Sequence, residues 1–220
     1  MSPGTIVLAS SPLVGPLTMD TLADAIRVHD VPVITAAAPH ALDDWLDALA
    51  IAAGPAVQPV VLVGFSAAGP RLPAAARRVH ADALVFLDSR LPEDGATPTG
   101  GEPDFDALLD RLTDTDGVVA PWSQWWGDGL LAALIPDAAL RQQFVAECPA
   151  LPRSVFTAPV PAPEFAGPCG YVALSESYPL SVSVARSRGW PVIELDGHHL
   201  WPLVRSDAVA GAVLDVAHRL

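Results

Sequence analysis

The chain has 220 residues, of which 51% are hydrophobic, so it is long enough for one substantial core and short for two. Its formal charge is −13 and its 12 basic residues are all arginine, so we expect no binding surface for nucleic acid or for an anionic membrane. The absence of lysine excludes Schiff-base chemistry and a P-loop nucleotide site.

Cysteine usage and hydrophobic run length indicate the compartment. Cys148 and Cys169 are too few for a disulfide framework and have no metal-ligand spacing, so we expect free thiols and no metal site. The N-terminus lacks a charged region followed by a long apolar run, because the run 6–9 is only strand-sized. No segment approaches about 18 consecutive apolar residues. These features predict a soluble cytoplasmic protein without a membrane partner.

Short apolar runs alternate with helical patterns at the beginning and at the end of the chain. Strands are expected over 5–9, 31–37, 60–64, 83–87, 170–174 and 191–195. Helices are expected from about residue 18, over 42–53, through the alanine-rich stretch to about residue 80, and over 181–188 and 207–219. Six strands alternating with helices predict an α/β fold, with a mostly parallel six-stranded sheet and helices on both faces.

The alternation stops between the fourth and fifth expected strands. Residues 89–168 are rich in proline and glycine, carry half of the tryptophan, and show short helical patterns over 105–112, 129–134 and 137–146. This stretch is far longer than an ordinary loop. We therefore expect a core made of residues 1–88 and 169–220, with residues 89–168 inserted as a lid.

The stretch 59–70 has the pattern of a nucleophile elbow. A buried strand leads to Ser66 and an alanine-rich helix follows, which is the context that lifts a serine hydroxyl above a sheet. Small residues at Gly64 and Ala68 permit the tight turn. Two other interpretations compete, a serine that only caps the helix and a dinucleotide-binding loop. The second is disfavoured because Ser66 occupies the position of the glycine that approaches a pyrophosphate.

Acids and histidines follow other strand ends. Asp88 comes directly after the strand 83–87, Glu176 comes shortly after 170–174, and His198 and His199 follow the last strand. A histidine at the same sheet edge as Ser66 can act as its general base. The chain order of serine, acid and histidine is the order found in α/β-hydrolases.

The chain resembles the α/β-hydrolase superfamily over nearly all of its length outside residues 89–168. The loop Ser10-Ser-Pro-Leu-Val-Gly-Pro16 resembles the family's loop after its first core strand, with Ser10 where a histidine is usual. Gly64-Phe-Ser-Ala-Ala-Gly69 resembles the elbow, and Gly197-His-His199 resembles the terminal histidine motif. The family's two leading strands are expected to be missing, because the first strand here begins at residue 5.

The resemblance implies a Ser-His-acid triad and leaves its acid open. Spacing to Leu203 and Asp207 favours His199 over His198 as the base. The family's usual acid position falls near Tyr178, so the acid is either Asp88, at a site that some members use, or a displaced Glu176. The acid would hold the imidazole in one tautomer. An oxyanion hole is expected from the backbone N–H of Ala67 and from that of Leu13 or Ser11, since Pro12 has none, and Leu13 is the donor we favour.

Three tryptophans, Trp122, Trp125 and Trp126, lie within five residues. Either they anchor the insertion to the core by packing, or they line an apolar pocket over Ser66. With the second interpretation, the other substrate-binding residues expected are Pro12, Phe65, His198 and Trp201.

These observations predict a serine hydrolase, of the esterase or thioesterase kind, that acts on the acyl group of a small apolar ester, lactone or thioester without a cofactor. Two alternatives remain open. One is a ligand-binding protein that has the hydrolase fold and no catalysis, and the other is a cyclase or acyltransferase that uses the same site.

Overall fold

The computed structural model describes residues 3–93, 95–98 and 103–220. Its centre is a sheet of six strands in the order β10-β9-β4-β3-β1-β2, and every neighbouring pair is parallel. The strands are β1 (Thr5–Ala9), β2 (Val33–Thr35), β3 (Val60–Phe65), β4 (Ala83–Leu87), β9 (Cys169–Ala173) and β10 (Val192–Glu194). The predicted fold class is thereby confirmed.

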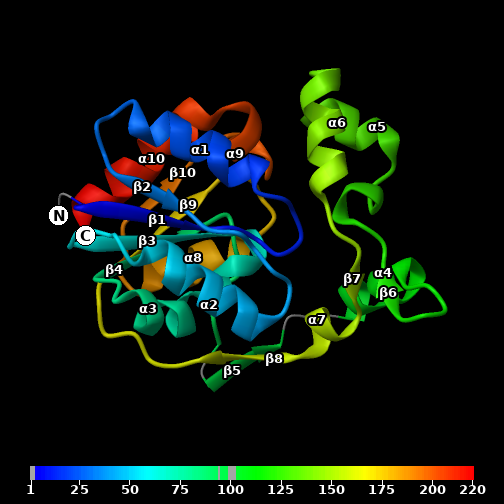
Figure 1. The fold of residues 1–220 in the computed structure, drawn as a ribbon, viewed down its shortest axis with the longest axis horizontal. Coiled ribbons are helices and arrows are strands. Elements are labelled where there is room, and N and C mark those ends of the chain that lie inside the picture. The colour runs from blue at the N-terminus through cyan, green and yellow to red at the C-terminus, as the bar shows by residue number, and fades with distance from the viewer. Residues whose placement is uncertain (1–2, 94, 99–102) are drawn as a thin grey trace.

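Both faces of the sheet are buried under helices. Side chains along a strand alternate between the two faces, so neighbouring residues enter different clusters. Ile6 and Leu8 of β1 point into one apolar cluster, while Val7 and Ala9 point into the other. The first cluster is covered by α1 (Leu17–Arg27), α9 (Trp201–Val204) and α10 (Ser206–Arg219). The second is covered by α2 (Leu42–Ala53), α3 (Leu72–Val79) and α8 (Pro179–Ser187). Figure 1 shows these two layers above and below the strands.

The helix that follows β3 is divided by its prolines. The chain first forms a 3-10 helix, η1 (Ser66–Arg71), and α3 begins only at Leu72 with Pro73 in its first turn. A proline is tolerated there because the first N–H groups of a helix have no partner within it. Pro73 therefore lies at the start of a new helix, whereas the sequence predicted a single helix to about residue 80.

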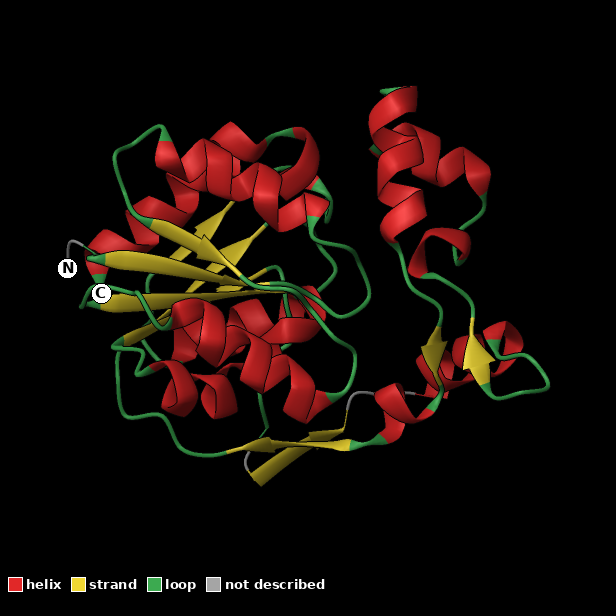
Figure 2. Cartoon of the chain, viewed as in Figure 1, coloured by secondary structure: helices red, strands yellow, loops and turns green. Residues whose placement is uncertain are grey.

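Residues 89–168 lie outside the six-stranded sheet (Figures 1 and 2). The predicted helical patterns form α4 (Pro103–Leu112), α5 (Asp128–Leu134) and α6 (Ala138–Glu147). The chain also forms η2 (Trp122–Gln124) and α7 (Ser154–Thr157). Two antiparallel pairs that the sequence did not predict join β5 (Gly95–Pro98) to β8 (Pro159–Ala162), and β6 (Val118–Val119) to β7 (Leu151–Pro152).

This segment packs in two ways. Around α5 and α6, the side chains of Leu131, Ile135 and Phe144 join the cluster that lies under α1 and α10. Around α4, β6 and β7, a separate small cluster forms from Leu109, Val119, Leu151 and Phe156. The segment thus combines a portion that shares the main core with a portion that has its own.

Candidate active site

Ser66 stands at the turn from β3 into η1 and has a left-handed backbone, with φ of +56°. This conformation is uncommon for a residue with a side chain and is maintained only where the surroundings enforce it. Gly64 permits the close packing of the turn, because a Cβ there would lie 2.6 Å from the side chain of Leu72. The Ser66 side chain is consequently presented at the carboxyl edge of the sheet.

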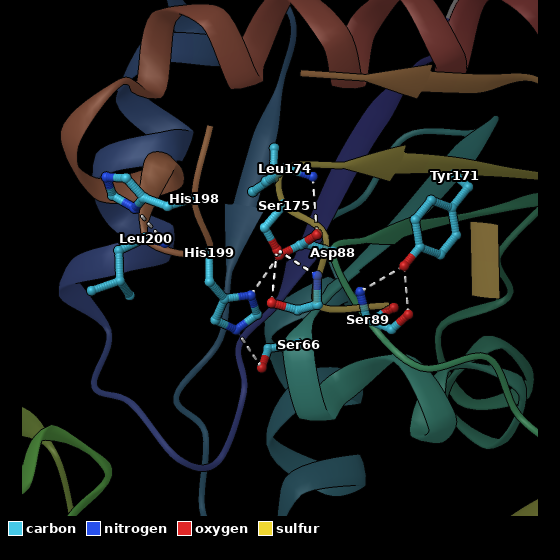
Figure 3. A network of polar contacts seen from close by, with 10 residues as sticks. Ser66, Asp88, Ser89, Tyr171, Leu174, Ser175, His198, His199 and Leu200 are labelled. Atoms are coloured by element: carbon cyan, nitrogen blue, oxygen red, sulfur yellow. Dashed lines mark hydrogen bonds and ion pairs between the residues drawn. The ribbon is translucent and has the colours of Figure 1, made fainter. Parts of the chain in front are cut away.

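His199 lies in the loop between β10 and α9, and its Nε2 is 2.9 Å from Ser66 Oγ (Figure 3). Its ring stacks on that of Phe65, with 4.7 Å between centroids. The side chain keeps 17% of its surface exposed. The imidazole is thus fixed on one side by an aromatic ring and remains accessible.

Asp88 directly follows β4 and is completely buried. His199 Nδ1 lies 2.6 Å from Asp88 Oδ2. The backbone N–H of Leu174 donates to Oδ1 at 2.9 Å, and the Ser175 hydroxyl donates to Oδ2 at 2.9 Å. A buried carboxylate requires such donors, since burial without hydrogen bonds is costly. Because a carboxylate only accepts, Nδ1 carries the proton and Nε2 accepts from the Ser66 hydroxyl.

Of the two candidate acids, Asp88 is therefore the one that contacts His199. Glu176 lies on the exposed part of the loop after β9 and is not in this hydrogen-bonded row. Sequence analysis did not identify Ser175, which donates to Asp88, or Tyr171, which holds the backbone of the next residue. Tyr171 on β9 donates from its hydroxyl to the carbonyl of Ser89 and accepts from the Ser89 N–H, and burial raises the pKa of that hydroxyl. The sequence held no signal for either role, because both residues are more than 80 positions from Asp88.

His198 points away from Ser66, on the opposite side of the loop (Figure 3). Its Nδ1 accepts from the N–H of Leu200 at 3.2 Å, and burial, together with the neighbouring His199, lowers its pKa. Trp201 packs edge-on against His198 and also against Gly197, where no side chain would fit. The contacts of His198 and Trp201 are thus with the loop itself, and the substrate-binding role expected of them stays a prediction.

The loop between β1 and α1 carries the second expected oxyanion donor. The N–H of Leu13 points to the hydroxyl of Ser11 at 3.3 Å, and Pro12 beside it is buried. At the start of the loop, Trp45 of α2 donates from its indole N–H to the carbonyl of Ser10 at 3.0 Å. Ala67 is the second residue of η1, a position whose N–H has no partner earlier in the helix.

The clustered tryptophans stay in contact through Trp126, which packs against both others, but Trp122 and Trp125 face different surroundings. Trp122 lies 6.2 Å from the His199 ring and is met edge-on by Phe144. Trp126, 44% exposed, packs on Trp122. Trp125 turns instead into the small cluster around Phe156, and its indole N–H donates to the carbonyl of Ala120. Trp125 therefore packs within the segment and does not contact His199. Packing was one of the two interpretations that the sequence left open for this motif.

Tyr178 completes the aromatic surroundings of His199, with 5.9 Å between the two ring centroids. The sequence had placed Tyr178 only near the usual acid position. In the ranges 3–93, 95–98 and 103–220, no group of three or more acidic, histidine or cysteine side chains is arranged to hold a metal ion. No helix within the same ranges is long and apolar enough to cross a membrane.

Comparison with known proteins identifies the fold. No protein-family model matches the sequence, and no curated protein matches it. Among solved structures, an extracellular α/β-hydrolase from a Paenibacillus species is 16% identical, with a TM-score of 0.74 over 97% of this chain and 99% of that one. A pyrethroid hydrolase from Sphingobium faniae is 17% identical, with a TM-score of 0.71 over 97% of both chains. Tomato methylketone synthase I complexed with 2-tridecanone is 15% identical, with a TM-score of 0.69 over 100% of this chain and 99% of that one. The protein described here has the α/β-hydrolase fold.

Proposed function

We propose that the protein is a serine hydrolase that cleaves an ester, lactone or thioester of a small apolar molecule. The observation that carries this proposal is the continuous row Asp88–His199–Ser66, with separations of 2.6 and 2.9 Å. Each side chain follows a different strand of the sheet, and the serine has the left-handed backbone of an elbow.

In the proposed reaction, Ser66 Oγ forms a bond to the acyl carbon while its proton moves to His199 Nε2. Asp88 keeps the Nδ1 proton in place and stabilises the imidazolium. The N–H groups of Ala67 and Leu13 would hold the negative oxygen, with Leu13 exchanging its long contact to the Ser11 hydroxyl for the substrate. The tetrahedral intermediate then collapses and breaks the bond to the leaving group. The leaving group takes the proton from His199. Water then attacks the acyl-enzyme in the same way, with His199 accepting its proton. The carboxylic acid product is released and Ser66 regains its proton.

The substrate class follows from the aromatic rings that meet at His199. Trp122 and Tyr178 lie beside His199, and Phe144 packs edge-on against Trp122, so the end of the row is apolar. We assign residues 89–168, which supply Trp122 and Phe144, as the lid. Two of the structural neighbours are compatible with this class, since one is named a pyrethroid hydrolase and another is bound to 2-tridecanone. No metal or cofactor is needed for the proposed steps.

A fluorophosphonate that reacts with activated serines tests the proposal. We expect rapid labelling of the protein at Ser66, measured by intact mass and peptide mapping. Ser66→Ala and His199→Ala should each lower the rate by about 10⁴-fold or more. Wild-type protein that remains unlabelled while binding a small apolar ligand would contradict the proposal and favour the non-catalytic alternative.

A further inference from the structure

The loop between β1 and α1, residues 10–16, lies between the two parts of the molecule. It starts at the carboxyl end of β1 and ends at the first turn of α1, which packs beside α6. In Figure 1 it is the dark blue loop that extends from the sheet toward the green segment. Because this loop carries Leu13, its position decides where one of the two proposed oxyanion donors points.

Glu147, the last residue of α6, contacts the end of this loop. Its Oε2 accepts a hydrogen bond from the backbone N–H of Leu17 at 2.9 Å. Leu17 is the first residue of α1, so the carboxylate lies at a helix N-terminus, where a negative charge and an acceptor are both favourable. The Cβ and carboxylate of Glu147 also lie directly over Gly15, where an added Cβ would overlap with them. The glycine therefore makes room for the glutamate.

A second contact joins the same loop to the segment. The half-buried side chain of Leu13 packs against the main core cluster and also against the small cluster around Leu109 and Phe156. The loop is thus held by residues 89–168 at Leu13 and at Leu17, on either side of Gly15. At its other end it is held from within the core by the hydrogen bond from Trp45 to Ser10.

We propose that Glu147 is a positioning residue for the oxyanion hole, coupling α6 of the segment to the loop that carries Leu13. The carboxylate touches neither Ser66 nor His199, so its effect is transmitted through Leu17, Gly15 and the loop. When Glu147 is seated, the loop is fixed at both ends and the orientation of Leu13 N–H is kept. When it is released, the loop keeps the hydrogen bond at Ser10 and the packing of Leu13 but loses its fixed end at Leu17, and the donor is less firmly oriented.

This inference rests on the proposed function, because an oxyanion donor matters only if an acyl group is cleaved at Ser66. Loss of one well-placed oxyanion donor lowers kcat by about 10²–10³-fold, so loosening one should cost about tenfold. Substrate binding uses other side chains, so KM should change little. A role confined to stability would lower the melting temperature without this division between kcat and KM.

The experiment compares four variants in hydrolysis of p-nitrophenyl butyrate, with hydrogen exchange of residues 11–17 measured in parallel. Glu147→Ala should lower kcat about tenfold, leave KM within about twofold and speed exchange in the loop. Glu147→Gln keeps an acceptor oxygen and should recover most of kcat. Gly15→Ala should reproduce the defect from the core side, because its methyl group occupies the place of the Glu147 side chain.

Asp137→Ala is the matched control. Asp137 caps the other end of α6 by accepting from the N–H of Leu140 at 2.7 Å, within the same helix. Its loss should lower stability while leaving kcat and loop exchange near wild type. The proposal is overturned if Glu147→Ala keeps wild-type kcat and loop exchange, if Asp137→Ala lowers kcat equally, or if Glu147→Gln is as impaired as Glu147→Ala.

Failure of the proposed function has a different signature. Wild-type protein would then neither hydrolyse the ester nor react with a fluorophosphonate, and the role in oxyanion positioning would fall with it. Loop exchange would still report whether Glu147 holds residues 10–16, independently of any activity.

Discussion

The six-stranded sheet and the segment 89–168 are stabilised by different amounts of apolar contact. β1, β3, β4 and β9 are buried at every residue and are covered by helices on both faces. The strands of the segment are two to four residues long, and its own cluster has four buried side chains. Yet this segment supplies Trp122 to the surroundings of His199. The sheet therefore holds the residues of the proposed chemistry, while the segment, whose own cluster is small, supplies an aromatic ring next to them.

The largest effect should come from the acid on the sheet. Asp88→Asn retains the shape of the side chain but favours the wrong imidazole tautomer, so we expect kcat to fall by about 10⁴-fold. Glu176→Gln, on the exposed loop after β9, should stay within about twofold of wild type. Steady-state kinetics on a p-nitrophenyl ester distinguish them. The reverse result would show that the row around Asp88 serves only structure.

Truncation of a buried leucine should lower the free energy of unfolding more in the sheet than in the segment. Leu62 in β3 and Leu109 in α4 are both fully buried. Leu62→Ala should lower the free energy of unfolding by about 2–5 kcal/mol, because the sheet core cannot collapse around the cavity. Leu109→Ala should lower global stability less and loosen mainly its own small cluster. Chemical denaturation provides the global value and hydrogen exchange the local one. Equal global losses would contradict the comparison.

Two tryptophan substitutions should distinguish the part of the segment beside His199 from the part that forms the small cluster. Trp122→Ala removes a ring beside His199 and should raise KM for an apolar ester about tenfold, the cost of roughly 1–2 kcal/mol of buried apolar surface. Trp125→Ala removes a ring from the small cluster and should lower stability, with a smaller change in KM. Michaelis–Menten kinetics and melting curves on both variants test this. A larger KM effect from Trp125→Ala would place that ring in the pocket.

The smallest effect concerns thiol reactivity. Burial raises the pKa of Cys148 in the segment to about 11, and that of Cys169 on β9 likewise to about 11. Because the thiolate is the reactive form, both should react slowly at pH 8 and faster as pH rises toward 11. Local opening should then favour Cys148. Alkylation of the Cys148→Ala and Cys169→Ala variants, followed by mass, compares the rates. Faster reaction at Cys169 would mean that β9 opens before the segment does.

Much of the fold could be predicted from the sequence because parallel strands are continuous apolar runs. The six strands were expected within a few residues of where they lie, and the elbow at Ser66 was predicted from its small neighbours. The choice between Asp88 and Glu176 was open, because both follow strands and sequence does not show which side chain turns inward. The strands β5, β7 and β8 escaped prediction because they contain proline, which normally argues against a strand.

The positions of the tryptophans could not be predicted for another reason. Trp122 and Trp125 are three residues apart, and which one faces His199 depends on how η2 turns between them. Ser175 and Tyr178 were likewise missed, since their roles arise from contacts with Asp88 and His199 that are distant in the chain.

The pairing of β3 with β4 has a mechanical consequence. Phe65 and Leu87 are register partners at the ends of these two adjacent strands. Ser66 and Asp88 are the residues that directly follow them. Their separation is therefore set by the spacing of neighbouring strands in the sheet, about 4.8 Å, and by the width of one imidazole. Motion of residues 89–168 cannot stretch that spacing without breaking backbone hydrogen bonds of the sheet. A displacement of the segment would therefore leave the alignment of Ser66 and Asp88 unchanged, because the sheet alone sets it.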